Sequence, residues 1–257
     1  MIKRDGHMHP NIMKKPHQGD EFILRAIELG FREIVFTDHM PFTVTGDEHD
    51  RIPFGMVGDY CAAVADFAEK YKDKISIKTG IEIDFHADCT DEIAEVLAAG
   101  KFDVILGSSH LNIAGFGVPF GNITKTDYAA LVLENYLRAA ESGLFYVMTH
   151  LDVYRWVFSE AMYPTIDDGF DVSVHEDLLC HIFKEMKKRD IALEVNAAPL
   201  YKKFDDLGAY PEKKILSVAE DYGLRLVYGS DAHSADKVGF EYDSVSKIIE
   251  NFGSARA

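Results

Sequence analysis

Short apolar segments alternate along the chain with longer segments in which apolar residues recur at helical spacing. The short segments predict seven strands, at residues 2–7, 32–37, 75–83, 102–106, 144–149, 191–195 and 225–228. The longer segments predict helices at residues 21–29, 56–71, 91–99, 126–142, 174–189, 211–222 and 242–251, the first of them capped by Asp20. Strands and helices that alternate in this way form a parallel sheet.

Residues that can bind metal ions stand at or near the ends of most of these strands. His7 and His9 end the first strand and share one face of an extended chain. The other candidate ligands are His17, in the loop that follows, and His39, Glu82, His110, His150, Asp231 and His233. In a closed barrel all strand ends meet on one face, whereas an open sheet gathers its site at one switch point. The distribution therefore favours an α/β fold with a distorted, TIM-like barrel and a metal site at the C-terminal ends of its strands.

The residue types of these candidates are suited to metal chemistry. A single histidine is more often a surface or hydrogen-bonded residue, so the prediction depends on the coincidence of several at strand ends. Neutral imidazole binds Zn²⁺, Mn²⁺ and Fe²⁺, and carboxylates can bridge two ions. Clustered ions can generate hydroxide at neutral pH and clamp a phosphoryl group. The three cysteines are too widely spaced for a disulfide framework or a cysteine zinc site.

Composition narrows the possible partners and locations. A formal net charge of −16 makes nucleic acid an improbable partner. The sequence contains no apolar run of about 18 residues and no N-terminal apolar region of a signal peptide, so we expect no membrane span and a cytoplasmic location. No repeat or linker divides the chain, and residues 1–257 are therefore interpreted as a single domain. The oligomeric state is left open.

At the candidate ligands the sequence resembles the PHP family, the polymerase and histidinol phosphatase metal-dependent phosphoesterases. The resemblance covers nearly the whole chain. It rests on six ordered motifs: His7-x-His9, Thr37-Asp38-His39, Gly80-Ile-Glu82, Gly107-Ser-Ser-His110, Thr149-His150-Leu-Asp152 and Gly229-Ser-Asp231-Ala-His233. It implies a distorted (β/α)7 barrel, with this chain as a single PHP domain, and a site for three divalent ions of Zn, Mn or Fe.

The resemblance also implies how the ligands divide. One ion is expected to bind His7, His9, Glu82 and Asp231, and a second to bind Glu82, His110 and His150. A third is expected to bind His17, His39 and His233. Glu82, Asp231 and His233 are the expected catalytic residues: Glu82 bridges two ions, a hydroxide between them attacks phosphorus, and Asp231 or His233 protonates the leaving alkoxide.

Groups that contact the substrate are harder to assign. Relatives tend to carry Thr-Ser-Gly-Leu-Arg after the sixth strand, where this chain has Asn196-Ala-Ala-Pro-Leu-Tyr-Lys-Lys203. Lys202 or Lys203 is a candidate replacement for a phosphate-binding arginine, although the two side chains are not equivalent. Arg155 either clamps a phosphate or forms an ordinary salt bridge. Asp38 and Asp152 either orient imidazoles or face away, and the loop at residues 113–121 is predicted to cover the site.

Length and the Thr-Asp-His-x-Pro-Phe stretch at residues 37–42 are most similar to histidinol-phosphate phosphatases within the family. The expected activity is hydrolysis of L-histidinol phosphate, a step of histidine biosynthesis, to L-histidinol and phosphate. Two alternatives remain: a related phosphoesterase that acts on another small ester, such as a nucleotide or sugar phosphate, and a metal-binding module without enzymatic activity.

Overall fold

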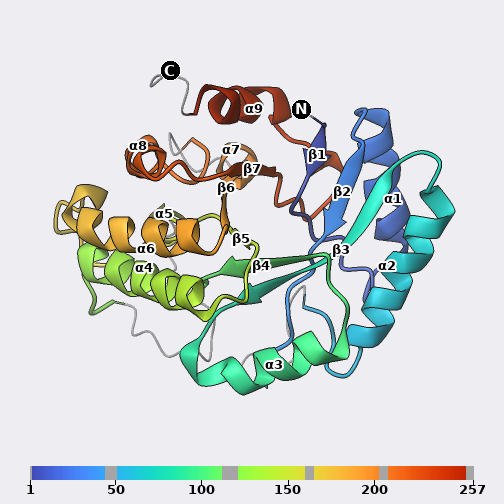
Figure 1. Cartoon of the computed structure of the whole chain (residues 1–257), viewed down its shortest axis with the longest axis horizontal. Helices are drawn as coiled ribbons and strands as arrows, with labels where there is room; N and C mark the ends of the chain where they lie inside the picture. The colour runs from blue at the N-terminus through green and yellow to red at the C-terminus, as the bar shows by residue number, and fades with distance from the viewer. Residues whose placement is uncertain (1, 44–50, 112–120, 160–164, 203–207, 253–257) are drawn as a thin grey trace.

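In the computed structural model, seven parallel strands follow one another in sequence order, and helices are arranged around them (Figure 1). The structure describes residues 2–43, 51–111, 121–159, 165–202 and 208–252. The strands in this part of the chain are β1 (Arg4–Asp5), β2 (Glu33–Phe36), β3 (Ser76–Asp84), β4 (Val104–Ser108), β5 (Val147–Met148), β6 (Ala192–Asn196) and β7 (Leu226–Gly229). All seven predicted strands are found, several of them shorter than expected.

The first and last strands meet and nearly close the sheet. The backbone N–H of Gly6 donates to Tyr228 O at 3.3 Å, and that of Asp231 donates to His7 O at 2.9 Å. Beyond the strands, His9 N donates to Ala232 O at 2.7 Å. The seven parallel strands thus form a distorted barrel, which confirms the predicted fold.

Helices connect successive strands, as the apolar spacing predicts. The described helices are α1 (Pro16–Glu28), α2 (Val57–Tyr71), α3 (Thr90–Ala99), α4 (Lys125–Ser142), α5 (Tyr154–Ser159), α6 (Glu176–Lys188), α7 (Ala198–Lys202), α8 (Lys213–Asp221) and α9 (Tyr242–Asn251). The short helices α5 and α7 were not predicted, because one or two turns give too little periodicity. No helix of the described residues is long and apolar enough to span a membrane.

The predicted start of the first helix is wrong. Asp20 does not cap it, because α1 begins at Pro16, where the missing N–H and fixed φ of proline suit the first turn. The Asp20 carboxylate instead accepts hydrogen bonds from Lys70 Nζ and Tyr71 Oη, both at 2.6 Å, and so ties α1 to α2. This shift places His17 inside a helix rather than in a loop.

Two apolar cores hold the ligand-bearing strands in place. A small core inside the barrel consists of Val35, Val104, Leu106, Val147 and Ala192. A larger one packs the helices against the outside of the sheet, with fully buried aromatic side chains such as Phe22, Tyr60 and Tyr136. Burial on both faces is typical of parallel strands and fixes the direction in which their ends point.

Candidate metal centre

Eight predicted ligands come together at the C-terminal ends of the strands. Their donor atoms form four overlapping groups, and the atoms of each group lie within 4.8 Å of one another. The groups are His7–His9–Glu82, Glu82–His110–His150, His7–His150–Asp231 and His9–His39–His233. The overlap shows that one compact cluster, rather than separate pairs, has formed at this face of the barrel.

Glu82, at the centre of the cluster, is completely buried and lies on β3. Its Oε2 lies 3.0 Å from His39 Nδ1 and 3.2 Å from His9 Nε2, and its Oε1 lies 2.9 Å from His150 Nε2. Burial opposes ionisation, but His39, His7 and His150 outweigh it and hold the pKa of Glu82 well below its usual value. The two oxygens of one ionised carboxylate therefore face different groups of imidazoles.

Asp231 provides the second carboxylate of the cluster. Its Oδ1 lies 3.3 Å from His9 Nε2 and 3.6 Å from His233 Nδ1. The His9 ring stacks against the ring of His39 and against that of His233, with centroid distances of 4.3 and 4.4 Å. Burial opposes protonation of His9, but Asp231 and Glu82 raise its pKa to about 9. Burial and the charge of His9 lower the pKa of His233 to about 4.

Two of the ligands adopt backbone conformations that are unfavourable for residues other than glycine. His150 has a φ of 24° and Asp231 a φ of 54°. The N–H of His150 donates to Glu194 Oε2 at 3.0 Å, and the carbonyl of Asp231 accepts from Tyr201 Oη at 2.6 Å. These hydrogen bonds stabilise the strained turns, which aim both side chains into the cluster.

Glu194, on β6, holds two of the clustered residues, His7 and His150, through hydrogen bonds. This role was not predicted from the sequence. Its Oε1 lies 2.7 Å from His7 Nδ1, and its Oε2 also accepts from Asn196 Nδ2 at 2.9 Å. A Cβ on Gly229 would overlap this carboxylate and lie 2.8 Å from His7 Cβ, so the close approach requires glycine. A carboxylate on the second nitrogen of a histidine fixes the ring and its tautomer. A charged residue within an otherwise apolar strand was the available signal.

Asp84, on β3, plays a similar role for His110 and was also missed. Its Oδ1 lies 2.7 Å from His110 Nδ1, and its Oδ2 accepts from Arg51 Nη2 at 2.6 Å. Burial opposes ionisation, but His110 and Arg51 outweigh it and hold the pKa of Asp84 well below its usual value. Asp84 lies two residues after Glu82, and the alternation of a strand places both on one face.

The donor set fits divalent metal ions. Nitrogen and carboxylate donors in this proportion suit Zn²⁺, Mn²⁺ or Fe²⁺. His7 Nε2 and His9 Nε2 face each other at 2.9 Å beside Glu82, an arrangement suited to two ligands of one ion. Nδ1 of His9 is buried and has no hydrogen-bond partner among the described residues. The two facing Nε2 atoms are available to an ion bound within the cluster.

Comparison with known proteins adds independent support for the fold and the family. The family model described as the PHP domain matches residues 5–198, about three quarters of the chain. The chain belongs to the PHP family. The matched residues include six of the eight clustered ligands, and the other two, Asp231 and His233, come just after β7.

Two curated relatives match this PHP chain over nearly its whole length. The "Probable histidinol-phosphatase" of Deinococcus radiodurans is 27% identical, with 97% of this chain and 93% of the relative covered. The histidinol-phosphatase of Bacillus subtilis is 27% identical, with coverage of 95% and 98%. The crystal structure of the Lactococcus lactis histidinol phosphate phosphatase, complexed with Zn, L-histidinol and phosphate, is 21% identical and has a TM-score of 0.71, with coverage of 96% and 93%. This structural likeness shows a shared fold.

The structure does not bring the ninth predicted ligand of the PHP chain into the cluster. His17 is exposed in the first turn of α1 and belongs to none of the donor groups found in the described residues. His9 takes its place beside His39 and His233.

The basic residues predicted to bind phosphate lie in different surroundings. Arg155 Nη1 donates to Asp152 Oδ2 at 2.9 Å, and its guanidinium lies over the ring of Tyr210. Lys202 is exposed at the end of α7, and its charge lowers the pKa of both Asp231 and His233, in addition to the larger effects of other neighbours. Lys203 and most of the predicted covering loop, residues 112–120, lie outside the described residues.

The two aspartates that adjoin ligands hold loops. Asp38 accepts from the backbone N–H groups of Asn11 and Ile12, at 2.9 and 3.2 Å. Asp152 accepts from Arg155 and from the N–H of Glu212 at 2.9 Å. In the described structure the residues that orient imidazoles are instead Glu194, on β6, and Asp84, on β3, which contact His7 and His110.

Proposed function

We propose that this chain is a metal-dependent phosphomonoesterase that hydrolyses L-histidinol phosphate to L-histidinol and phosphate. The observation that carries the reaction class is the pair of donor groups that share Glu82 at the C-terminal face of a PHP barrel. The assignment of L-histidinol phosphate as the substrate is based on two histidinol-phosphatase relatives, which match this chain along nearly its full length. One domain over residues 1–257, a cytoplasmic location and the absence of a nucleic-acid partner remain predictions.

Three divalent ions, of Zn, Mn or Fe, are the proposed cofactors. His7, His9, Glu82 and Asp231 would hold one ion, Glu82, His110 and His150 a second, and His39 and His233, together with His9, a third. Bound ions would supply an activated water and neutralise charge on the phosphoryl oxygens. His17 would need a different position of the start of α1 to contribute, so its part in the third site stays a prediction.

The residues of the chain have separate proposed roles. Glu82 would link two ion sites through its two ionised oxygens, while Glu194 and Asp84 hold His7 and His110 in position. Either Asp231 or His233 would pass a proton to the leaving alkoxide. The low pKa of both groups favours the unprotonated form, which suits a metal ligand. To protonate the leaving alkoxide, one of them would need a higher pKa once substrate is bound.

Lys202 is the favoured phosphate contact among the described basic residues. Its charge already acts on Asp231 and His233, at the edge of the cluster. Arg155 forms an ion pair with buried Asp152, and its guanidinium lies over the ring of Tyr210. The Tyr210 ring centroid in turn lies 6.5 Å from that of His150. A phosphate contact from Arg155 or Lys203 remains a prediction.

The test is phosphate release from L-histidinol phosphate by protein loaded with Mn²⁺ or Zn²⁺. A kcat/KM above about 10⁴ M⁻¹s⁻¹, the lower end for enzymes with their own substrates, is expected. A nucleoside monophosphate and a sugar phosphate provide the matched comparison. Faster turnover of either, with only a trace rate on L-histidinol phosphate, would contradict the substrate and leave the reaction class intact.

A second candidate is a PHP phosphoesterase for another small phosphate ester. It is favoured by the segment after β6, where this chain forms α7 with Lys202 rather than presenting an arginine. Lysine binds phosphate as a point charge and lacks the bidentate geometry of arginine, so it would hold the phosphate group differently. A non-enzymatic metal-binding module would instead bind metal and turn over none of the three esters.

A further inference from the structure

A cavity of about 390 Å³ lies at the opposite end of the barrel from the metal centre. Its lining includes Arg4, Val104, Val147 and Leu226, which begin β1, β4, β5 and β7. The metal ligands follow the other ends of these strands. The cavity is therefore the N-terminal mouth of the barrel, closed on one side by residues of α9.

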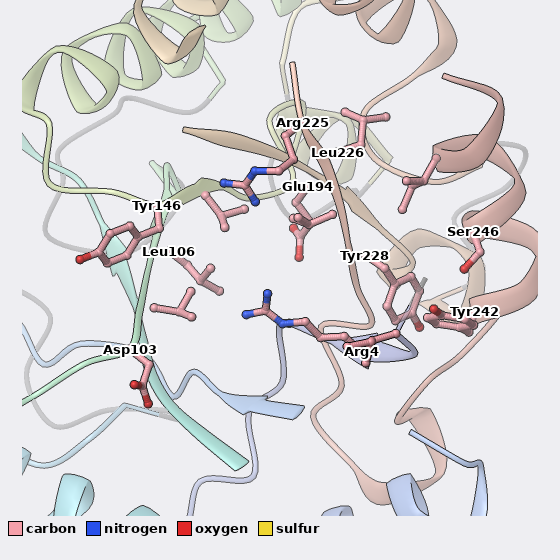
Figure 2. A pocket seen from close by; sticks show the side chains of 16 residues that line it. Arg4, Asp103, Leu106, Tyr146, Glu194, Arg225, Leu226, Tyr228, Tyr242 and Ser246 are labelled. Atoms are coloured by element: carbon pink, nitrogen blue, oxygen red, sulfur yellow. The ribbon is translucent and has the colours of Figure 1, made fainter. Parts of the chain in front are cut away.

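Two arginines give this mouth its charge. Figure 2 shows the guanidinium groups of Arg4 and Arg225 pointing into the same space, with Leu106 on one side and Glu194 on the other. In the described part of the chain, no carboxylate lies within ion-pair distance of Arg225, whose Nη2 makes only a long 3.4 Å contact with Asp190 O. Arg4 keeps one ion pair, from Nε to Glu33 at 2.9 Å. Two guanidinium groups directed at one space favour an anion there, although the chain as a whole has a net charge of −16.

The walls of the mouth are mainly apolar. Leu106, Leu226 and Val227 line it, and the rings of Tyr146 and Tyr242 border it. Two carboxylates also reach the cavity, but both accept hydrogen bonds from the protein. Glu194, at the inner end, accepts from His7, His150 and Asn196, and Asp103 accepts from the N–H of Thr79 at 3.0 Å.

We propose that the N-terminal mouth of the barrel binds a small carboxylate anion with an apolar body. The carboxylate would lie between Arg4 and Arg225, which present planar donors suited to it, and the apolar body would rest against Leu106 and Leu226. The volume is in the range of small-ligand sites, which combine apolar walls with a few polar groups. This second site does not depend on the proposed phosphatase activity.

Phenylacetate is a suitable probe, and phenylacetamide is its neutral isostere. Each is titrated into the full chain labelled at its leucine and valine methyl groups, with and without bound Zn²⁺, and followed by NMR. We expect saturable shifts of Leu106, Leu226 and Val227 with phenylacetate in both states, unchanged by inorganic phosphate. Phenylacetamide should bind at least about tenfold more weakly, because charge-assisted hydrogen bonds are lost.

Arginine variants identify the contacts. Arg225→Gln and Arg4→Gln should each weaken phenylacetate binding about tenfold or more, whereas Arg138→Gln, an exposed change on α4, should leave it unchanged. Unchanged methyl spectra away from the mouth show that each variant is folded. Three results would overturn the proposal: no saturable shift at the mouth, displacement by inorganic phosphate, or equal binding by the Arg225→Gln and Arg138→Gln variants.

Discussion

Glu194→Gln is the change that most directly tests how the barrel positions its metal ligands. The carboxylate accepts from His7 at 2.7 Å, from the N–H of His150 at 3.0 Å and from Asn196 at 2.9 Å. Glutamine keeps one acceptor oxygen and turns an NH₂ group toward a donor. At least one charge-assisted hydrogen bond is lost, worth about 1.5–3 kcal/mol.

That loss predicts a fall in metal affinity of about 10- to 100-fold, the range for carboxylates that orient a ligating histidine. The two estimates agree, since a tenfold change in affinity corresponds to about 1.4 kcal/mol. The measurement is Zn²⁺ affinity by competition with a chromophoric chelator, with Glu95→Gln, an exposed change on α3, as the matched control.

The pH dependence sharpens this prediction. Burial lowers the pKa of His7, but Glu194, Asp231 and Glu82 raise it well above its usual value, so protons compete with metal at His7. Glu194→Gln lowers that pKa and reduces the competition. The affinity ratio of wild type to variant should therefore be largest at high pH and shrink as the pH falls. Equal affinities of the Glu194→Gln and Glu95→Gln proteins at high pH would refute the reasoning.

Three further changes test the surroundings of the cluster, and a fourth, Gly58→Ala on α2, serves as the control for the first. Gly229→Ala should lower the free energy of unfolding by about 1–3 kcal/mol and weaken metal binding, because its Cβ would overlap Glu194. Gly58→Ala, in α2, should instead stabilise by roughly 0.5–1 kcal/mol, because its Cβ would meet Ala99 O at 3.7 Å, an ordinary contact distance. Glu82→Gln should lower kcat/KM by at least about 100-fold, because it removes an ionised group shared by two ion sites. In chelated protein, Asp84→Asn should cost stability above about pH 4 and progressively less below it. The depressed pKa of Asp84 adds stability that is full above its unfolded value of 3.8 and is lost as the pH falls toward the folded value.

Each of these predictions can be contradicted by a specific result. Equal effects of the two glycine changes, measured by urea unfolding, would show that the approach of Glu194 to β7 is unimportant. Full activity of Glu82→Gln with intact metal content would exclude a shared carboxylate. A stability difference for Asp84→Asn that stays constant from pH 6 to pH 3 would show that its charge contributes nothing in the fold.

The sequence predicted the parts of this protein that local patterns determine. Strands of alternating or continuous apolar residues placed His7, Glu82 and His150 at the ends of the barrel strands, and the predicted bounds of α9 agree with the structure. Local pattern failed at α1, where Pro16 rather than Asp20 begins the helix.

The supporting groups could not be found in the same way. The pairing of Glu194 with His7 joins residues 187 positions apart, and it exists only because β7 lies beside β1, and β6 beside β7, in a nearly closed barrel. Likewise, the charge of Lys202 reaches Asp231 because the short helix α7 lies against that residue, whose carbonyl accepts from Tyr201 Oη. Such contacts depend on tertiary geometry, which no spacing in the sequence encodes by itself.

The most direct test of the central claim is to follow bound metal and phosphate release together. Chelated protein is titrated with Zn²⁺ or Mn²⁺ in the presence of L-histidinol phosphate, and both quantities are recorded at each addition. Activity should be absent without metal and rise as the sites around Glu82 fill. Full turnover by metal-free protein, or filled sites without turnover of any phosphomonoester, would contradict the account.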